Sequence, residues 1–174
     1  ILTTSNSKFK PANFIIKYVK KLIPKWAIPE VIYFSEALHE GKQPPKSPRL
    51  IIPTSKYTYT ARDTRAGITE HRYIKQGGSE LFNTDALKSR KPVFIVEGEI
   101  DALSIIEAGG EALALGSIAN INKLITLLKE NKPIQPLLIA LDNDEEGQKA
   151  AANLTEELTR LKIPFHKVNI AEGH

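Results

Sequence analysis

The stretch PLLIALDNDEEGQKAA, residues 136–151, joins an apolar run directly to a cluster of acidic residues. The run has the length and composition of a buried strand, and a helical pattern from Glu145 to Lys162 follows it. Four carboxylates within five residues repel one another, so the fold either uses them or keeps them in water. The stretch therefore predicts a strand that ends at a chemically active edge, marked by Asp142, Asp144, Glu145 and Glu146.

Segments of the same kind alternate through the C-terminal half of the chain. Apolar strands are expected at 93–98, 111–115, 136–142 and 164–170, with amphipathic helices between them. Strands that alternate with helices are typical of the α/β class, with a mostly parallel sheet covered by helices on both faces. The helices are expected at 101–110, 121–131 and 145–162, and the last of them is expected to bury Ala151, Leu154, Leu158 and Leu161 on one stripe.

The first half of the chain has a different texture. Residues 1–44 contain an amphipathic helical pattern at 11–23, then a second short helix and the start of a proline-rich linker. Short alternating strands follow and indicate a small basic α+β subdomain. We therefore predict a helical segment and linker over 1–44, a basic subdomain over 45–90 and the α/β domain over 91–174.

The charge of the chain is unevenly distributed. The net charge is +4, but residues 1–90 carry 16 Lys and Arg against 7 Asp and Glu, whereas residues 91–174 carry 8 against 13. A basic half (+9) joined to an acidic half (−5) suits a protein that holds a polyanion beside metal ions. Two solvated surfaces of opposite charge would give the same distribution. The chain has no cysteine, no membrane-length apolar run and no signal peptide pattern, so a cytoplasmic protein without a membrane partner is expected.

Acidic residues follow two of the predicted strands. Glu97 lies at the tip of the strand at 93–98. Asp142 lies at the tip of the strand at 136–142, and Asp144 follows two residues later. Ligands of parallel sheets bind at the carboxyl ends of the strands, and neighbouring strands lie about 5 Å apart. Converging carboxylates are costly without a cation, and hard oxygen ligands suit Mg²⁺ or Mn²⁺. The sequence therefore predicts a divalent metal site at this edge.

Other interpretations of the acidic cluster explain less. A calcium loop requires a bidentate Glu where this sequence has Asn153. A phosphatase of the haloacid type would use Asp142 as nucleophile and leave Glu97 without a role. Asp144, Glu145 and Glu146 could instead cap the next helix and interact with its dipole. Capping accounts for part of the cluster, chiefly Glu145 and Glu146, but not for Glu97 or Asp142.

Three short motifs in this order resemble the Toprim family. They are Glu97-Gly98, Gly116-Ser117 and the D-x-D-x-x-G run from Asp142 to Gly147. The extended form E-G-E-I-D-A-L-S, which contains Asp101, is similar to the branch found in bacterial-type DNA primases, including those of phages and mobile elements. The resemblance covers about residues 90–170.

The resemblance implies a nucleotidyltransferase of the DNA-directed RNA polymerase type, which makes short RNA primers. It implies Mg²⁺ or Mn²⁺ as cofactor, with a single-stranded DNA template, ribonucleoside triphosphates and a replicative helicase as partners. Glu97 would be a metal ligand or a general acid/base, which the sequence leaves open. The implied catalytic residues are Glu97, Asp142 and Asp144; the metal ligands are these three with Asp101; the structural turns are at Gly98, Gly116 and Gly147.

The segment before the α/β domain is more distantly similar to the basic subdomain of bacterial primases. That subdomain has a strand–proline run, then F-G-G-R and a K-Y pair, for which this chain has residues 50–53, 59–62 and 72–73. The resemblance implies contacts to nucleic acid or nucleotide, and proximity adds one lysine to the set. The expected contact residues are Arg62, Arg72, Tyr73 and Lys75.

Several alternatives stay open at this point. Arg62 could instead form a surface ion pair with Asp63 or Glu70. The chain could be a Toprim nuclease or topoisomerase fragment, or a non-catalytic DNA-binding module. In the family a further acidic pair follows the last predicted strand and a zinc module lies upstream. We therefore expect a C-terminally truncated catalytic domain that is weakly active or inactive by itself.

Overall fold

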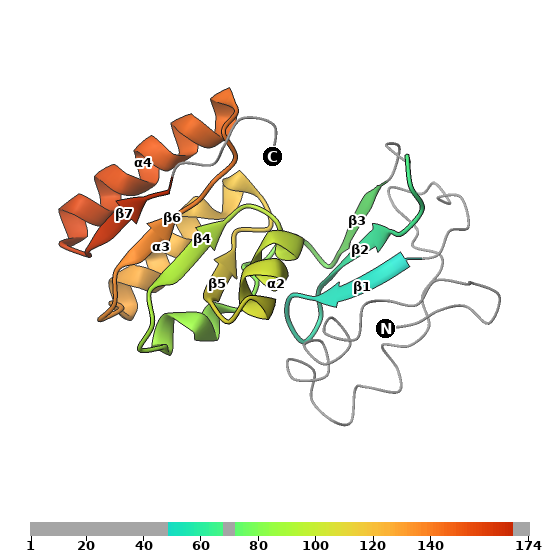
Figure 1. The fold of residues 1–174 in the computed structure, drawn as a ribbon, viewed down its shortest axis with the longest axis horizontal. Coiled ribbons are helices and arrows are strands. Elements are labelled where there is room, and N and C mark those ends of the chain that lie inside the picture. Colours follow the sequence, from blue (N-terminus) through green and yellow to red (C-terminus); the bar gives the residue numbers. More distant parts are fainter. Residues whose placement is uncertain (1–48, 68–71, 169–174) are drawn as a thin grey trace. The chain divides into compact units, whose positions relative to one another are not determined.

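The computed structural model describes residues 49–67 and 72–168, and the predicted helical segment and linker at 1–44 lies outside them (Figure 1). The chain divides into two compact units, Ile1–Ser79 and Glu80–His174. These are called here the N-terminal unit and the C-terminal unit. The division falls ahead of the boundary predicted at 90/91. Within the described part of the chain, no helix is long and apolar enough to cross a membrane.

The N-terminal unit contains a three-stranded antiparallel sheet in the order β1-β2-β3. Its register aligns Ile51 with Ala61, and Ala61 with Ile74, and these three side chains form a small buried cluster. The opposite face carries Arg62 beside Tyr73, because side chains alternate along each strand. The strands are β1 (Arg49–Pro53), β2 (Tyr59–Asp63) and β3 (Tyr73–Gln76).

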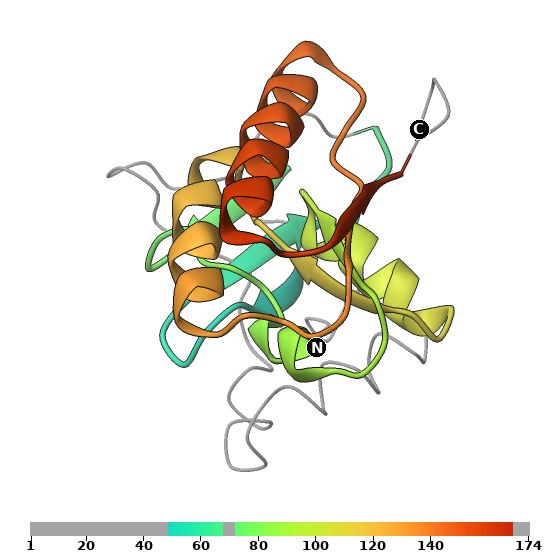
Figure 2. The same ribbon diagram turned by 90° about the vertical axis from the view of Figure 1, so that its left-hand side faces the viewer.

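The C-terminal unit contains a four-stranded parallel sheet in the order β5-β4-β6-β7. Helix α2 lies on one face of the sheet, and helices α3 and α4 lie on the other (Figures 1 and 2). The predicted α/β, Toprim-like sheet with helices on both faces is therefore confirmed. The elements are β4 (Val93–Val96), α2 (Glu99–Glu107), β5 (Glu111–Ala114), α3 (Ile121–Glu130), β6 (Leu137–Ile139), α4 (Glu145–Leu161) and β7 (Phe165–Lys167), with short 3-10 helices η1 (Thr84–Lys88) and η2 (Ile118–Asn120).

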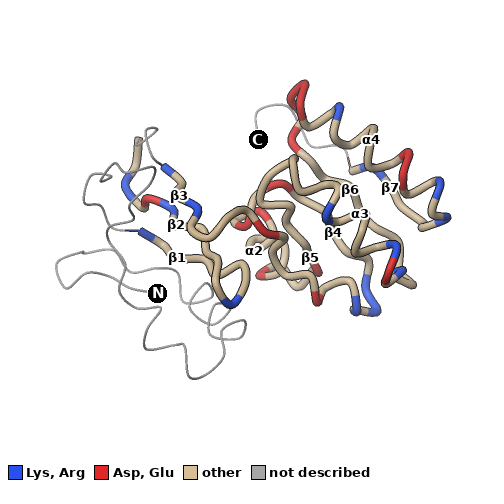
Figure 3. The backbone as a smooth tube through the Cα atoms, turned by 180° about the vertical axis from the view of Figure 1, so that it is seen from behind, with Lys and Arg blue, Asp and Glu red and all other residues tan. Residues whose placement is uncertain are grey.

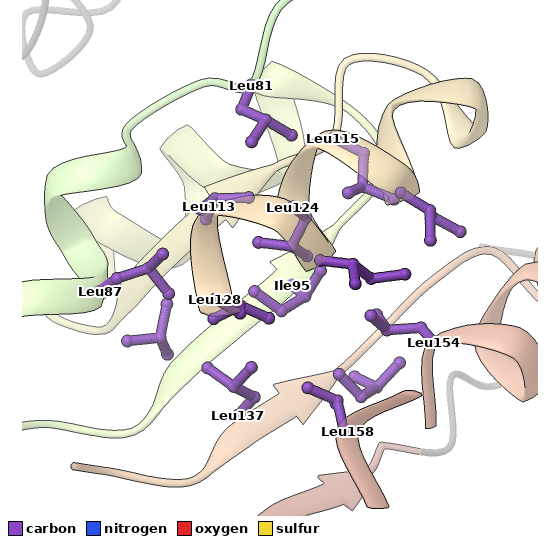
Figure 4. Close-up of a cluster of buried hydrophobic side chains, with 14 of the residues drawn as sticks. Leu81, Leu87, Ile95, Leu113, Leu115, Leu124, Leu128, Leu137, Leu154 and Leu158 are labelled. Carbon is purple, nitrogen blue, oxygen red and sulfur yellow. The ribbon is translucent and has the colours of Figure 1, made fainter. Parts of the chain in front are cut away.

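The core of this unit lies between the sheet and the pair α3 and α4 (Figure 4). Strand residues such as Ile95 meet Leu124 of α3 and Leu154 of α4 in one cluster, and all three are almost completely buried. The buried stripe of α4 runs through Ala150, whereas Ala151, which the helical pattern predicted to be buried, is only partly covered. The stripe consists of Gly147, Ala150, Leu154 and Leu158, at the helical spacing of three or four residues.

Residues before β4 also belong to this unit. Phe82 forms an antiparallel bridge with Ala114, with N–O distances of 2.8 and 3.1 Å in the two directions, and only 1% of Phe82 is exposed. The Asn83 amide donates to the Ala112 carbonyl at 2.8 Å. Strand β5 lies at the edge of the parallel sheet, so its backbone groups are available to this segment. This pairing explains why the C-terminal unit begins at Glu80.

Candidate acidic site at the carboxyl edge of the sheet

The order of the strands brings two separate acidic segments together. Strands β4 and β6 are direct parallel neighbours, with Ile95 in register with Ile139, so both leave the sheet at the same edge. Glu97 follows β4, and Asp142 follows β6. The backbone N–H of Asp142 donates to Glu97 Oε1 at 3.1 Å. Two of the predicted site residues, 45 positions apart in the sequence, are therefore joined directly.

Asp144 has the capping role that was considered for it together with Glu145 and Glu146. It is the N-cap of α4, and its Oδ1 accepts from the backbone N–H of Gly147 at 2.7 Å. A carboxylate at this position satisfies an otherwise unpaired amide and interacts favourably with the helix dipole. Glu145 and Glu146 lie exposed in the first helical turn, and Glu145 pairs with Lys149. Figure 3 shows this acidic run where α4 begins.

Gly147 lies within α4 rather than in a turn, which corrects the prediction from the sequence. A Cβ at this position would stand 2.1 Å from the Asp142 carbonyl oxygen and 2.9 Å from Glu97 Oε1. The first of these distances is far inside van der Waals contact. Glycine is therefore required here because the helix begins directly against the two strand ends that carry the acids.

The other two predicted turn glycines also lie at this edge. Gly116 has a left-handed φ of 67°, and its N–H donates to the Glu97 carbonyl at 2.8 Å, so it forms the expected turn after β5. Gly98 has an extended backbone and is the N-cap of α2. A Cβ on Gly98 would lie 2.6 Å from Asp101 Oδ2, so the Asp101 side chain turns back across the start of its own helix.

The charges of these acids act on one another. Burial raises the pKa of Glu97, and the carboxylates of Asp142, Asp144 and Asp101 raise it further, against a smaller lowering by the hydrogen bond from the Asp142 amide. Burial likewise raises the pKa of Asp142, followed by the charges of Asp101 and Asp144. The four predicted acids therefore form one electrostatic group at this edge.

The chemistry of this group fits a hard divalent cation. In residues 49–67 and 72–168, no three His, Cys, Asp or Glu side chains are arranged to hold an ion as they stand. One reason is visible: Glu97 and Asp144 each direct an oxygen at a backbone amide. Each carboxylate has a second oxygen. A cation bound among the acids would relieve the mutual repulsion that adds to the raised pKa of Glu97 and of Asp142. Glu97, Asp101, Asp142 and Asp144 are the residues that would hold it.

Three of the predicted contact residues of the N-terminal unit lie in β2 and β3, and the fourth, Arg72, directly precedes β3. The Arg62 and Arg72 guanidinium carbons lie 5.4 and 5.8 Å from the centroid of the Tyr73 ring, which is 47% exposed. Lys75 lies on the same face of β3 as Tyr73, and its Nζ donates to Ser79 Oγ at 3.4 Å. Arg62, Arg72 and Lys75, together with the accessible aromatic ring of Tyr73, are called the cationic group.

Asp63, one of the two partners considered for Arg62, forms ion pairs with two other arginines. Asp63 is buried and pairs with Arg65 at 2.8 Å and with Arg49 at 3.8 Å. Burial lowers the pKa of Arg49, and the charge of Asp63 raises it again. Glu70, the second partner considered, lies outside the described residues.

One exposed aromatic, Tyr57, is absent from the predicted set, although a tyrosine in the short connection between two strands was a usable signal.

Comparison with known proteins identifies the C-terminal part of the chain. Residues 94–174 match the family described as Toprim-like. The DNA primase of Mycoplasma genitalium is 38% identical over 91 residues, which is 51% of this chain and 15% of that protein. A shorter match, 46% identical over 37 residues, links 21% of the chain to 7% of a long-chain-fatty-acid–CoA ligase of Escherichia coli O6:H1. Residues 94–174 are therefore a Toprim-like domain.

Two solved structures share the fold. The primase fragment of the bacteriophage T7 primase-helicase protein has a TM-score of 0.56 at 17% identity, over 78% of this chain and 56% of that chain. The Aquifex aeolicus primase, with its zinc-binding and RNA polymerase domains, has a TM-score of 0.56 at 20% identity, over 94% of this chain and 44% of that one. At this level of identity the likeness is one of fold, and the chain spans less than two thirds of each of these two structures.

Proposed function

We propose that this chain is part of the catalytic core of a DNA primase, a Mg²⁺- or Mn²⁺-dependent nucleotidyltransferase that joins ribonucleotides into short primers on single-stranded DNA. The observation that supports this most is the convergence of acids from two neighbouring strands, fixed by the hydrogen bond from the Asp142 amide to Glu97. Asp101 and Asp144 belong to the same electrostatic group.

The acids divide into two roles under this proposal. Asp142 and Asp144 are exposed and would hold the cation, which would supply charge stabilisation for nucleotidyl transfer. Glu97 orients the Asp142 backbone through its hydrogen bond. Its second oxygen would either complete the metal shell or act as the base, and the raised pKa makes this carboxylate a stronger base than an ordinary Glu.

The cationic group of the N-terminal unit holds the polyanionic substrates. Arg62, Arg72 and Lys75 contact phosphates of the template or of the ribonucleoside triphosphate, and the Tyr73 ring offers a surface for a base. Contacts of this kind are largely independent of sequence and weaken with salt. A replicative helicase is a further proposed partner, since one structural relative is the primase fragment of a primase-helicase protein.

The test has two stages, because the 174 residues are expected to be weakly active or inactive alone. Mn²⁺ binding to this chain is measured first by calorimetry, with Asp142→Asn as the disabled variant and Glu146→Gln as the matched control. Incorporation of labelled ribonucleotides on single-stranded DNA is then measured in the full-length gene product. Failure to bind Mn²⁺ at millimolar concentration would favour a non-catalytic module. DNA cleavage without incorporation would move the assignment to the nuclease branch.

A further inference from the structure

The connection between β1 and β2 presents an aromatic–cation pair that the proposed function has not used. Tyr57 is 78% exposed, and Lys56 Nζ lies 5.2 Å from the centroid of its ring. The ammonium lies over the ring of an exposed tyrosine, whose large accessible area leaves room for a second planar group. An exposed aromatic ring beside a cation is the usual means of binding an unpaired nucleobase and its phosphate.

The connection is held in one conformation by its own hydroxyl groups. The backbone N–H of Thr54 donates to the Thr58 carbonyl at 3.0 Å, and the two threonine hydroxyls lie 2.7 Å apart. Ser55 Oγ accepts from the Tyr57 amide at 3.2 Å and from the Thr58 hydroxyl at 2.7 Å. Both side chains at the tip therefore project from a closed network rather than from a loose loop.

The end of β3 supports the same tip from beneath. Gly77 has a φ of +77°, and a Cβ on it would lie 2.6 Å from the Tyr57 carbonyl oxygen and 2.9 Å from Thr58 Cγ2. No other residue would allow this approach without a shift of the tip. A connection whose backbone is already fixed loses little conformational entropy when a ligand stacks on its side chain, which favours binding.

The pair belongs to the same sheet as the group around Tyr73. Arg62, which lies over the Tyr73 ring, belongs to β2, and Tyr57 lies two residues before that strand begins. One aromatic–cation site therefore lies in the connection that leads into β2, and the other lies near the opposite end of that strand.

We propose that Tyr57 stacks on an unpaired base of single-stranded nucleic acid while Lys56 contacts an adjacent phosphate. This site extends the nucleic-acid surface beyond the residues implied by family resemblance, and it rests on the proposed function. Recognition is by the face of the base, so it does not depend on the base identity.

Binding of a fluorescent 16-nucleotide oligothymidylate to the whole 174-residue chain tests this, by anisotropy across a salt series. Tyr57→Leu should weaken binding roughly 5- to 100-fold, while leaving the slope of log affinity against log salt unchanged. Tyr57→Phe should bind within about twofold of the native chain, because the ring is kept. Lys56→Gln should make the slope shallower by about 0.7, the value for one phosphate contact on a single strand.

An abasic oligonucleotide of equal length separates stacking from other effects, because it keeps the phosphates and lacks the bases. The native chain and Tyr57→Leu should bind it equally. Ile134→Ala, which alters a side chain 91% exposed in the other unit, is the matched control and should change nothing.

Native affinity of Tyr57→Leu for the oligothymidylate would overturn the inference and leave the proposed function standing. An equal loss on the abasic strand would also overturn it. If the native chain bound no oligonucleotide at low salt, the nucleic-acid part of the proposed function would fall as well.

Discussion

The geometry of the acidic edge in the C-terminal unit is fixed in a different way from that of the cationic sheet in the N-terminal unit. At the acidic edge the backbone sets the geometry: an amide of Asp142 binds Glu97, and Gly147 lies against the Asp142 carbonyl. On the cationic sheet, side chains arrange one another, since two arginines stack on Tyr73. Changes at the acidic edge should therefore act on chemistry or on folding, whereas changes on the cationic sheet should act on affinity and its salt dependence.

The largest expected effect is on catalysis at the acidic edge. Glu97→Gln or Asp142→Asn in the full-length gene product should lower ribonucleotide incorporation about 100-fold or more, because charge stabilisation in the transition state is lost. The matched change Glu146→Gln, in an exposed acid of the same segment, should have little effect. Comparable losses from all three variants would show that the overall charge of the edge matters rather than the two strand-end acids.

The next effect is on folding. Gly147→Ala should lower the free energy of unfolding by about 3 kcal/mol, because the added methyl group overlaps the Asp142 carbonyl and the helix must shift. Gly109→Ala is the control: its φ of +88° is unfavourable to alanine, but nothing lies within 4 Å, so a cost of about 1 kcal/mol is expected. Urea denaturation of both variants measures the difference. Equal costs would mean that α4 adjusts freely at its start.

A smaller effect concerns the repulsion between acids without metal. The folded-state pKa of Glu97 is raised above its ordinary 4.5, so the folded chain binds that proton more tightly than the unfolded chain. The contribution to stability is then complete below pH 4.5 and is lost as pH rises through the raised value. Asp142→Asn removes one source of the shift, and it should flatten this loss and stabilise the metal-free chain by about 0.5–1 kcal/mol at pH 7.

Thermal unfolding across pH in the presence of chelator checks this, and added Mn²⁺ should reverse the ranking of the two proteins. Marked destabilisation by Asp142→Asn in chelator would instead show a structural role for that carboxylate. The amide that binds Glu97 belongs to the backbone, so the substitution itself leaves that hydrogen bond in place.

The smallest effect belongs to the cationic sheet. Arg62→Ala or Arg72→Ala should each make the dependence of log affinity on log salt shallower by about 0.7 for single-stranded DNA, with little change in stability. Lys149→Gln, which removes an exposed cation of the C-terminal unit, is the matched control. If neither arginine variant changed the slope, Arg62 and Arg72 would not contact the phosphates.

Much of the C-terminal unit was accessible from the sequence because its signals are local. Apolar runs at β4 and β6 and the helical spacing of α4 follow from which side chains must leave water. Placement of the acids at strand ends, and of a basic sheet before them, could be predicted in the same way. The pattern predicted Leu154 and Leu158 correctly, but the buried stripe continues through Ala150 and Gly147 rather than through Ala151 and Leu161, which are only partly buried.

Contacts between distant segments were decided only by the tertiary structure. The sequence determined that Glu97 and Asp142 end strands, but the order β5-β4-β6-β7 makes those strands neighbours. The sequence predicted Gly147 to be a turn glycine. In the structure, glycine is required there because the Asp142 carbonyl approaches too closely for any side chain. Likewise, nothing local to Tyr57 indicates that Gly77 supports it from another strand. Close packing between elements depends on where each backbone passes, and local residue preferences do not encode that path.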